Sequence, residues 1–110
     1  MKLVASLTSP YARKVRVALA EKSIPFELVV DSPWEPTSTV PELNPLCKVP
    51  VLITDDDEAF FDSPIICAWI ETLTAEPRLI PLDPLEAVRV RQLEALADGI
   101  TDAVVAIVLE

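Results

Sequence analysis

Residues 44–52 read Asn-Pro-Leu-Cys-Lys-Val-Pro-Val-Leu, a stretch that joins a loop to a buried strand. Proline has no backbone N–H and a fixed φ, so a sheet tolerates it best where a strand begins. We therefore expect a strand from Pro50 to Thr54. A cis bond before Pro50 turns the Val49 backbone outward, where its N–H and C=O can pair with an extended peptide. A trans bond that opens an ordinary strand is the alternative.

The chain before this stretch predicts a strand, a helix and a second strand. Residues 2–6 are apolar enough for a short interior strand, and Ser9 followed by Pro10 is a typical helix start. Residues 22–25 end the helix, and residues 26–30 form the second strand. A strand, helix and strand of this size indicate a right-handed crossover between two parallel strands.

The chain after it predicts a hairpin and a further helix. The proline-rich residues 31–42 form a loop with at most a short helix at its end, and an acidic turn at residues 55–58 separates the third strand from a fourth at 59–61. Ser63 and Pro64 repeat the helix start signal, for a helix that extends to about Leu73. We predict a four-stranded sheet with the order second, first, third, fourth, in which the third and fourth strands run antiparallel to the first two.

The last third of the chain predicts a linker and one long helix. Residues 76–83 contain two prolines, and Asp83 with Glu86 has the spacing of a capping box. We expect a first domain over residues 1–75, a linker over 76–83 and a helix over 84–110. Beyond Ile100 this helix is apolar on more than one face, so a second subunit or further helices are expected to cover it.

Composition excludes several classes of function. The net charge of −9 argues against nucleic acid and anionic membranes as partners, and the lack of histidine removes the commonest base and zinc ligand. Two cysteines far apart in sequence, Cys47 and Cys67, predict reduced thiols in a cytoplasmic protein and no metal site. No run is apolar and long enough for a membrane span. The single glycine, Gly99, excludes a glycine-rich phosphate loop.

Three loops are expected to meet at one edge of the sheet, which brings Ser9, Val49 and the pair Asp62 and Ser63 together. Ser9 lies at a helix N-terminus, where N–H groups and the helix dipole favour a thiolate, to which its hydroxyl can donate. Its alternative role is plain helix capping, and the two roles can coexist. Asp62 can meet the ammonium of an amino acid and Ser63 its carboxylate, or both can simply cap the helix that follows.

Three stretches of this chain resemble a known family. Residues 8–16 (Thr-Ser-Pro-Tyr-Ala-Arg-Lys-Val-Arg), residues 44–52 and residues 62–66 (Asp-Ser-Pro-Ile-Ile) are similar to the N-terminal domain of glutathione transferases. The resemblance covers residues 1 to about 75. From Asp83 onward the chain resembles the first helix of the family's all-helical second domain, particularly in bacterial members.

The resemblance implies a thioredoxin-like βαβ-ββα fold with a mixed four-stranded sheet. It implies glutathione as co-substrate, with no other cofactor and no metal. In this family pattern Ser9 stabilises the glutathione thiolate, Val49 before a cis Pro50 pairs with the cysteinyl backbone, Asp62 and Ser63 hold the γ-glutamyl group, and Lys48 assists. The resemblance also implies a homodimer in which the long helix meets its counterpart and Asp98 approaches the partner subunit's glutathione.

The function expected from these observations is transfer of glutathione to an electrophilic small molecule, as in detoxification. The alternative is a glutathione-binding or assembly module with the same fold and no turnover. A thiol–disulfide oxidoreductase is disfavoured, since Ser9 and Ala12 occupy the Cys-x-x-Cys positions of the thioredoxin-like scaffold. Cys47 stands where the family pattern has glycine, either as a passive small residue or as a thiol that forms a mixed disulfide with glutathione.

Overall fold

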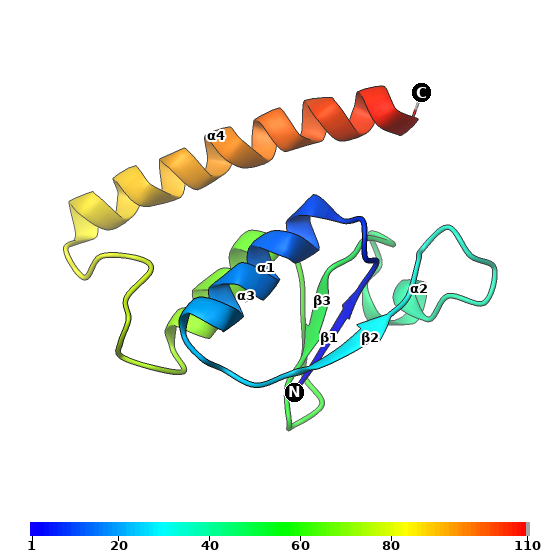
Figure 1. Ribbon diagram of the computed structural model, residues 1–110, viewed down its shortest axis with the longest axis horizontal. Helices are drawn as coiled ribbons and strands as arrows, with labels where there is room; N and C mark the ends of the chain where they lie inside the picture. Colours follow the sequence, from blue (N-terminus) through cyan, green and yellow to red (C-terminus); the bar gives the residue numbers. More distant parts are fainter. Residues whose placement is uncertain (110) are drawn as a thin grey trace. The chain divides into compact units, whose positions relative to one another are not determined.

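The structure, a computed structural model, describes residues 1–109 and divides the chain into two compact units, Met1–Pro77 and a second that begins at Arg78. The first unit contains four strands and three helices (Figure 1). In chain order they are β1 (Lys2–Ala5), α1 (Pro10–Glu21), β2 (Glu27–Val30), α2 (Val40–Leu43), β3 (Val51–Ile53), β4 (Ala59–Phe60) and α3 (Ser63–Glu71).

The four strands form one sheet in the order β2-β1-β3-β4. β1 pairs with β2 in parallel, β3 is antiparallel to β1, and β4 is antiparallel to β3. The predicted α/β class and strand order are therefore confirmed. The predicted direction of the fourth strand is wrong: β4 reverses the direction of β3, which itself opposes β1, so β4 runs parallel to β1. The tight acidic turn at residues 55–58 reverses the chain once, and this single reversal sets the direction of β4.

Alternate residues of β1 enter two separate cores, because successive side chains of a strand point to opposite faces. Leu3 and Ala5 belong to the core that α1 and α3 cover, whereas Val4 belongs to a smaller core beneath α2. The larger core holds buried side chains of α1, α3 and β3, namely Ala12, Val15, Ala18, Leu19, Leu52, Ile66 and Ile70. α1 and α3 therefore lie on one face of the sheet and α2 on the other.

A buried ion pair joins the C-terminal ends of α1 and α3. The side chain of Lys22, the C-cap residue of α1, is 0% exposed, and its Nζ lies 2.8 Å from Oε1 of Glu71. The same ammonium donates to the carbonyl oxygen of Thr74 at 3.0 Å and to its hydroxyl at 3.3 Å. Burial of the charge is therefore offset by an opposite charge and by hydrogen bonds, as a buried lysine requires.

The start of α3 differs from the prediction by one residue. Asp62, and not Ser63, is the N-cap, and its Oδ1 accepts from the backbone N–H of Ser63 at 2.7 Å. Asp62 has extended backbone geometry and a carboxylate, both of which suit a cap, so Ser63 becomes the first helical residue. The helix ends at Glu71, two residues before the predicted Leu73, where the Thr72 and Leu73 N–H groups make turn bonds.

The second unit contains one helix, α4 (Pro84–Leu109). Its start shows half of the predicted capping box: the N–H of Glu86 donates to Oδ2 of Asp83 at 2.9 Å, but the Glu86 carboxylate pairs with Arg89 instead of bonding back to Asp83. No residue of α4 is buried. Glu110, the last residue of the predicted helix, lies outside the described residues. Within residues 1–109 no helix is long and apolar enough to cross a membrane.

Candidate functional site

Strand register brings the first loop and the proline loop to the same edge of the sheet. β1 ends at Ala5 and leads into Ser9, and β3 begins at Val51, immediately after Val49 and Pro50. Val4 near the end of β1 pairs with Val51 at the start of β3. Because the two strands are antiparallel, the chain leaves β1 and enters β3 at one edge.

The third segment reaches this edge through β4. Phe60 pairs with Leu52, and β4 runs in the direction of β1, so it also ends at the edge where β1 ends. Asp62 and Ser63 follow within three residues. The corrected direction of β4 is therefore what brings the start of α3 to the edge that carries Ser9 and Val49.

Ser9 caps α1 and keeps its hydroxyl proton available. Its Oγ accepts from the backbone N–H of Ala12 at 3.1 Å. An acceptor bond of this kind leaves the O–H free to donate, since a hydroxyl has one donor proton and two acceptor lone pairs. Ser9 is half-buried. Capping and donation to a ligand atom are thus compatible at this position.

The proline loop is held by a residue to which sequence reasoning assigned no role. Asn44 is 2% exposed, its Nδ2 donates to the carbonyl oxygen of Lys48 at 3.1 Å, and its Oδ1 accepts from the N–H of Leu46 at 2.8 Å. Asparagine before proline is a signal for such side-chain turns. Cys47 adopts a φ of 56° in this loop, which explains why the family pattern has glycine there.

Val49 presents unpaired backbone groups beside Pro50. The Val49–Pro50 peptide bond is cis, and within residues 1–109 neither the N–H nor the C=O of Val49 takes part in a hydrogen bond. Val49 is half-buried, whereas Pro50 is buried and Lys48 is exposed. Half-buried unpaired backbone groups can receive an extended ligand as an added strand.

The start of α3 presents a carboxylate and a hydroxyl. Asp62 is exposed, and Ser63 is 1% exposed. Among the described residues, Ser63 Oγ is a buried side-chain oxygen without a hydrogen-bond partner. Buried polar atoms are normally satisfied, so this hydroxyl is a candidate to donate a hydrogen bond to a ligand.

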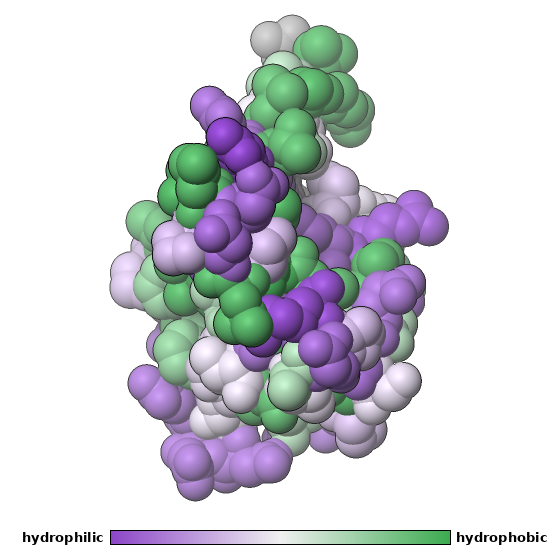
Figure 2. All heavy atoms as spheres, turned by 90° about the vertical axis from the view of Figure 1, so that its left-hand side faces the viewer, coloured by the Kyte–Doolittle hydropathy of each residue, from purple (hydrophilic) through white to green (hydrophobic). Residues whose placement is uncertain are grey.

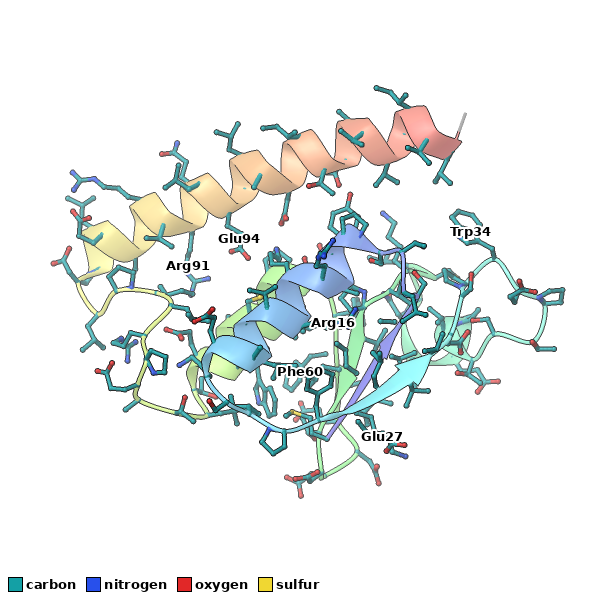
Figure 3. All side chains as sticks on the ribbon, in the orientation of Figure 1. Arg16, Glu27, Trp34, Phe60, Arg91 and Glu94 are labelled. Carbon is teal, nitrogen blue, oxygen red and sulfur yellow. The ribbon has the colours of Figure 1, made fainter. Side chains whose placement is uncertain are left out.

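The loop that follows β2 is tied to an aspartate at its start. Oδ2 of Asp31 accepts from the N–H of Thr39 at 3.0 Å and from its hydroxyl at 2.8 Å. A hydrogen bond from the Ser38 side chain, then those from Thr39, hold the pKa of Asp31 below its ordinary value. Trp34 in the same loop is 76% exposed and stands out from it (Figure 3). Within residues 1–109 no three Cys, Asp or Glu side chains cluster as metal ligands.

Known proteins are similar to this chain in sequence and in fold. The family model for the glutathione S-transferase N-terminal domain matches residues 8–73. The chain is 52% identical over 103 residues to the GST-like protein YibF of Escherichia coli, and this match covers 94% of the chain and 51% of YibF.

Two solved structures are also similar to the chain. A glutathione S-transferase from Methylobacillus flagellatus with GSH bound is 48% identical, with a TM-score of 0.93 over 98% of this chain and 54% of that one. A glutathione S-transferase from Methylobacterium radiotolerans in complex with glutathione sulfonate is also 48% identical, with a TM-score of 0.89 over 96% of this chain and 50% of that one. The chain spans about half the length of these proteins. It belongs to the glutathione S-transferase family, whose N-terminal domain it contains.

Proposed function

We propose that the chain binds glutathione at the edge formed by Ser9, Val49 and Ser63, stabilises its thiolate and presents the sulfur to an electrophilic small molecule. The unpaired backbone of Val49 carries this proposal, because an added strand is what its N–H and C=O require. The two solved relatives described above hold glutathione or its sulfonate, which supports the same ligand here.

Each part of the tripeptide has a matching group at this edge. The cysteinyl backbone pairs with Val49, and the γ-glutamyl ammonium and carboxylate meet Asp62 and Ser63. The Ser63 hydroxyl, which has no partner among the described residues, donates to that carboxylate. Exposed Lys48 adds a positive charge for the anionic ligand.

Ser9 is the residue proposed to act on the sulfur. The hydroxyl donates to the thiolate, and the N-terminus of α1 adds the favourable end of the helix dipole. Both effects stabilise the charged form and lower the thiol pKa, so that more of the bound ligand is nucleophilic at neutral pH. Ser9 therefore serves catalysis, whereas Val49 and Asp62 serve binding.

A homodimer that covers α4 is part of the proposal. Figure 2 shows apolar side chains gathered at the C-terminal end of α4, where Ile107, Val108 and Leu109 are 71%, 75% and 60% exposed. Burial of each such side chain is worth about 1.5–3 kcal/mol, which favours association. Asp98 on this helix is proposed to approach the partner's glutathione. Sedimentation at micromolar concentration tests this, and a monodisperse monomer contradicts it.

We place the protein in the cytoplasm, where Cys47 and Cys67, which form no disulfide, stay reduced. The catalytic proposal is tested by titrating the ultraviolet absorbance of the thiolate of bound glutathione against pH. We expect a thiol pKa below that of free glutathione, together with conjugation of an activated aryl halide. Binding with an unchanged thiol pKa and no conjugation supports the non-catalytic module instead.

A further inference from the structure

Asp31 closes the long loop that connects β2 with α2. Residues 31–39 contain no helix or strand, and the loop leaves the end of β2 and returns to α2 (Figure 1). At its start the N–H of Asp31 donates to the carbonyl oxygen of Ala5 at 3.0 Å, which extends the pairing of β2 with β1 by one residue. At its end the half-buried Asp31 side chain binds Thr39. One residue therefore joins the ends of β1 and β2 to the start of α2.

Thr39 gives both of its donors to this carboxylate. It is the N-cap residue of α2, but its side chain makes no cap bond. Instead its hydroxyl donates to Oδ2 of Asp31 at 2.8 Å, and its N–H donates to the same oxygen at 3.0 Å. An ionised acceptor makes stronger hydrogen bonds than a neutral one. Because α2 has only four residues, its own helical bonds cannot hold it in place, and its position depends on packing and on the bonds at its two ends.

A buried side chain connects α2 with the proline loop. Val40, the first residue of α2, is 0% exposed and shares a core with Val4 and Val51. Val49 packs against the same core. Close packing transmits a displacement of one side chain to its neighbours. The position of α2 therefore affects the position of Val49.

Hydrogen bonds at the C-terminal end of α2 make a second connection. The N–H of Asn44 donates to the carbonyl oxygen of Val40 at 2.8 Å, and the Asn44 side chain holds the carbonyl oxygen of Lys48. Lys48 directly precedes Val49 in the chain. The residue that fixes the proline loop is thus itself held by α2, whose start is held by Asp31.

We infer that Asp31 is a positioning residue for glutathione binding, which closes the loop before α2 and so holds the Val49 backbone where it pairs with the cysteinyl backbone of glutathione. The inference rests on the proposed function, since it takes Val49 to be the partner of that backbone. Asp31 acts through Thr39 and α2. Its carboxylate bonds to Thr39 and Ser38, whereas the proposed thiolate donor, Ser9, caps α1, so Asp31 takes no part in activating the thiol.

Asp31→Ala is expected to weaken glutathione binding roughly tenfold, because both bonds to Thr39 are lost. The rate of conjugation at saturating glutathione and the pKa of the bound thiol are expected to stay at their wild-type values. Asp31→Asn keeps an acceptor oxygen for Thr39 and is expected to recover most of the affinity. Glu35→Gln removes an exposed carboxylate from the same loop and is the matched control, with wild-type affinity. Calorimetry measures the affinities, and ultraviolet titration measures the thiol pKa.

Hydrogen exchange of the ligand-free protein tests the connection from Asp31 to Val49 without glutathione. In Asp31→Ala, mass spectrometry is expected to show faster exchange over residues 39–49 and unchanged exchange in α1 and α3. Thr54→Val controls for a loss of overall stability. It removes a bond from the Glu58 N–H to the Thr54 hydroxyl at the opposite end of β3, and it is expected to keep the wild-type affinity for glutathione.

Three results overturn the inference and leave the proposed function standing. They are wild-type glutathione affinity in Asp31→Ala, unchanged exchange over residues 39–49 in that variant, and an equal loss of affinity in Thr54→Val. Failure of the wild-type protein to bind glutathione overturns the proposed function and this inference with it.

Discussion

Asn44 donates through Nδ2 to the carbonyl oxygen of Lys48 at 3.1 Å, and so spans the loop that leads to Val49. The other end of the same amide accepts from the N–H of Leu46 at 2.8 Å. A buried amide with both ends paired fixes a loop more firmly than its backbone bonds alone. The unpaired N–H and C=O of Val49 are therefore presented by a loop whose shape depends on one side chain.

Asn44→Ala is expected to destabilise the protein and weaken glutathione binding together. The backbone groups of Leu46 and Lys48 lose their partners, which costs about 1–3 kcal/mol for each group left buried. Urea unfolding measures the stability and calorimetry the affinity. Asn44→Asp keeps the acceptor for Leu46 but sets a second acceptor oxygen, with a buried charge, against the carbonyl oxygen of Lys48, so it too is expected to destabilise the loop. Wild-type glutathione affinity in Asn44→Ala contradicts the role given to this loop.

Ser9→Ala is expected to lower the rate of conjugation by roughly a hundredfold while glutathione affinity changes little. The hydroxyl bond strengthens as charge develops on sulfur, whereas the pairing at Val49 is unaffected. Ser9→Thr keeps both the hydroxyl and the helix cap and is expected to retain activity, whereas Ser9→Asp keeps the cap acceptor without the donor and is expected to lose activity. Asp62→Ala is expected to show the reverse pattern, with affinity lost first. Kinetics and calorimetry on the same samples distinguish a loss of conjugation rate from a loss of glutathione affinity. An equal loss of affinity in Ser9→Ala and Asp62→Ala rules out separate roles in catalysis and binding.

The ion pair between Lys22 and Glu71 predicts that substitutions at these two residues have non-additive effects on the free energy of unfolding. Lys22→Met leaves the largely buried Glu71 carboxylate without its ammonium and is expected to cost about 3 kcal/mol in the free energy of unfolding. Adding Glu71→Leu removes the buried carboxylate that has lost this ammonium, so the double variant is expected to be more stable than Lys22→Met alone. Chemical denaturation of the three proteins measures the coupling. Additive effects of the two substitutions on the free energy of unfolding would exclude an energetic coupling between Lys22 and Glu71.

The Asp31 carboxylate is expected to stabilise the folded protein by an amount that depends on pH. Because its pKa is lowered in the folded state, chiefly by the Ser38 hydrogen bond, the carboxylate stabilises the fold above its ordinary pKa of about 4. This contribution is lost as the pH falls through the lowered folded-state value. The stability difference between wild type and Asp31→Asn is therefore expected to be constant near neutrality and to shrink below about pH 4. Glu35→Gln, in the same loop, controls for the loss of one charge.

A difference between wild type and Asp31→Asn that grows as the pH falls would show that the carboxylate is not stabilised by these bonds. Urea unfolding at a series of pH values supplies the comparison.

Local signals in the sequence predicted most of the fold, and the long-range geometry came only from the structure. The pair Ser9-Pro10 indicates a helix start, and Pro50 before an apolar run indicates a strand start. Both signals depend only on neighbouring residues in the chain, so the sequence predicted where α1 and β3 begin to within one residue. The direction of β4 follows from its antiparallel pairing with β3, and no residue of β4 itself indicates that direction. Ser63 was assigned as a cap because Ser-Pro is a common start signal, but the Asp62 carboxylate competes for that position and prevails.

The site shows the same limit. Motifs predicted the three segments of the candidate site, but their convergence depends on the pairing of Val4 with Val51 and of Leu52 with Phe60. Asn44 was visible only as part of a motif, because its two hydrogen bonds are properties of the folded loop.

Calorimetric titration of the purified protein with glutathione tests the central claim most directly, with cysteinylglycine as the matched ligand that lacks the γ-glutamyl group. We expect saturable binding of one glutathione per chain and at least tenfold weaker binding of cysteinylglycine, because the charge-assisted bonds to Asp62 and Ser63 are then absent. Absence of saturable glutathione binding, or equal affinity for the two ligands, would contradict the site described here.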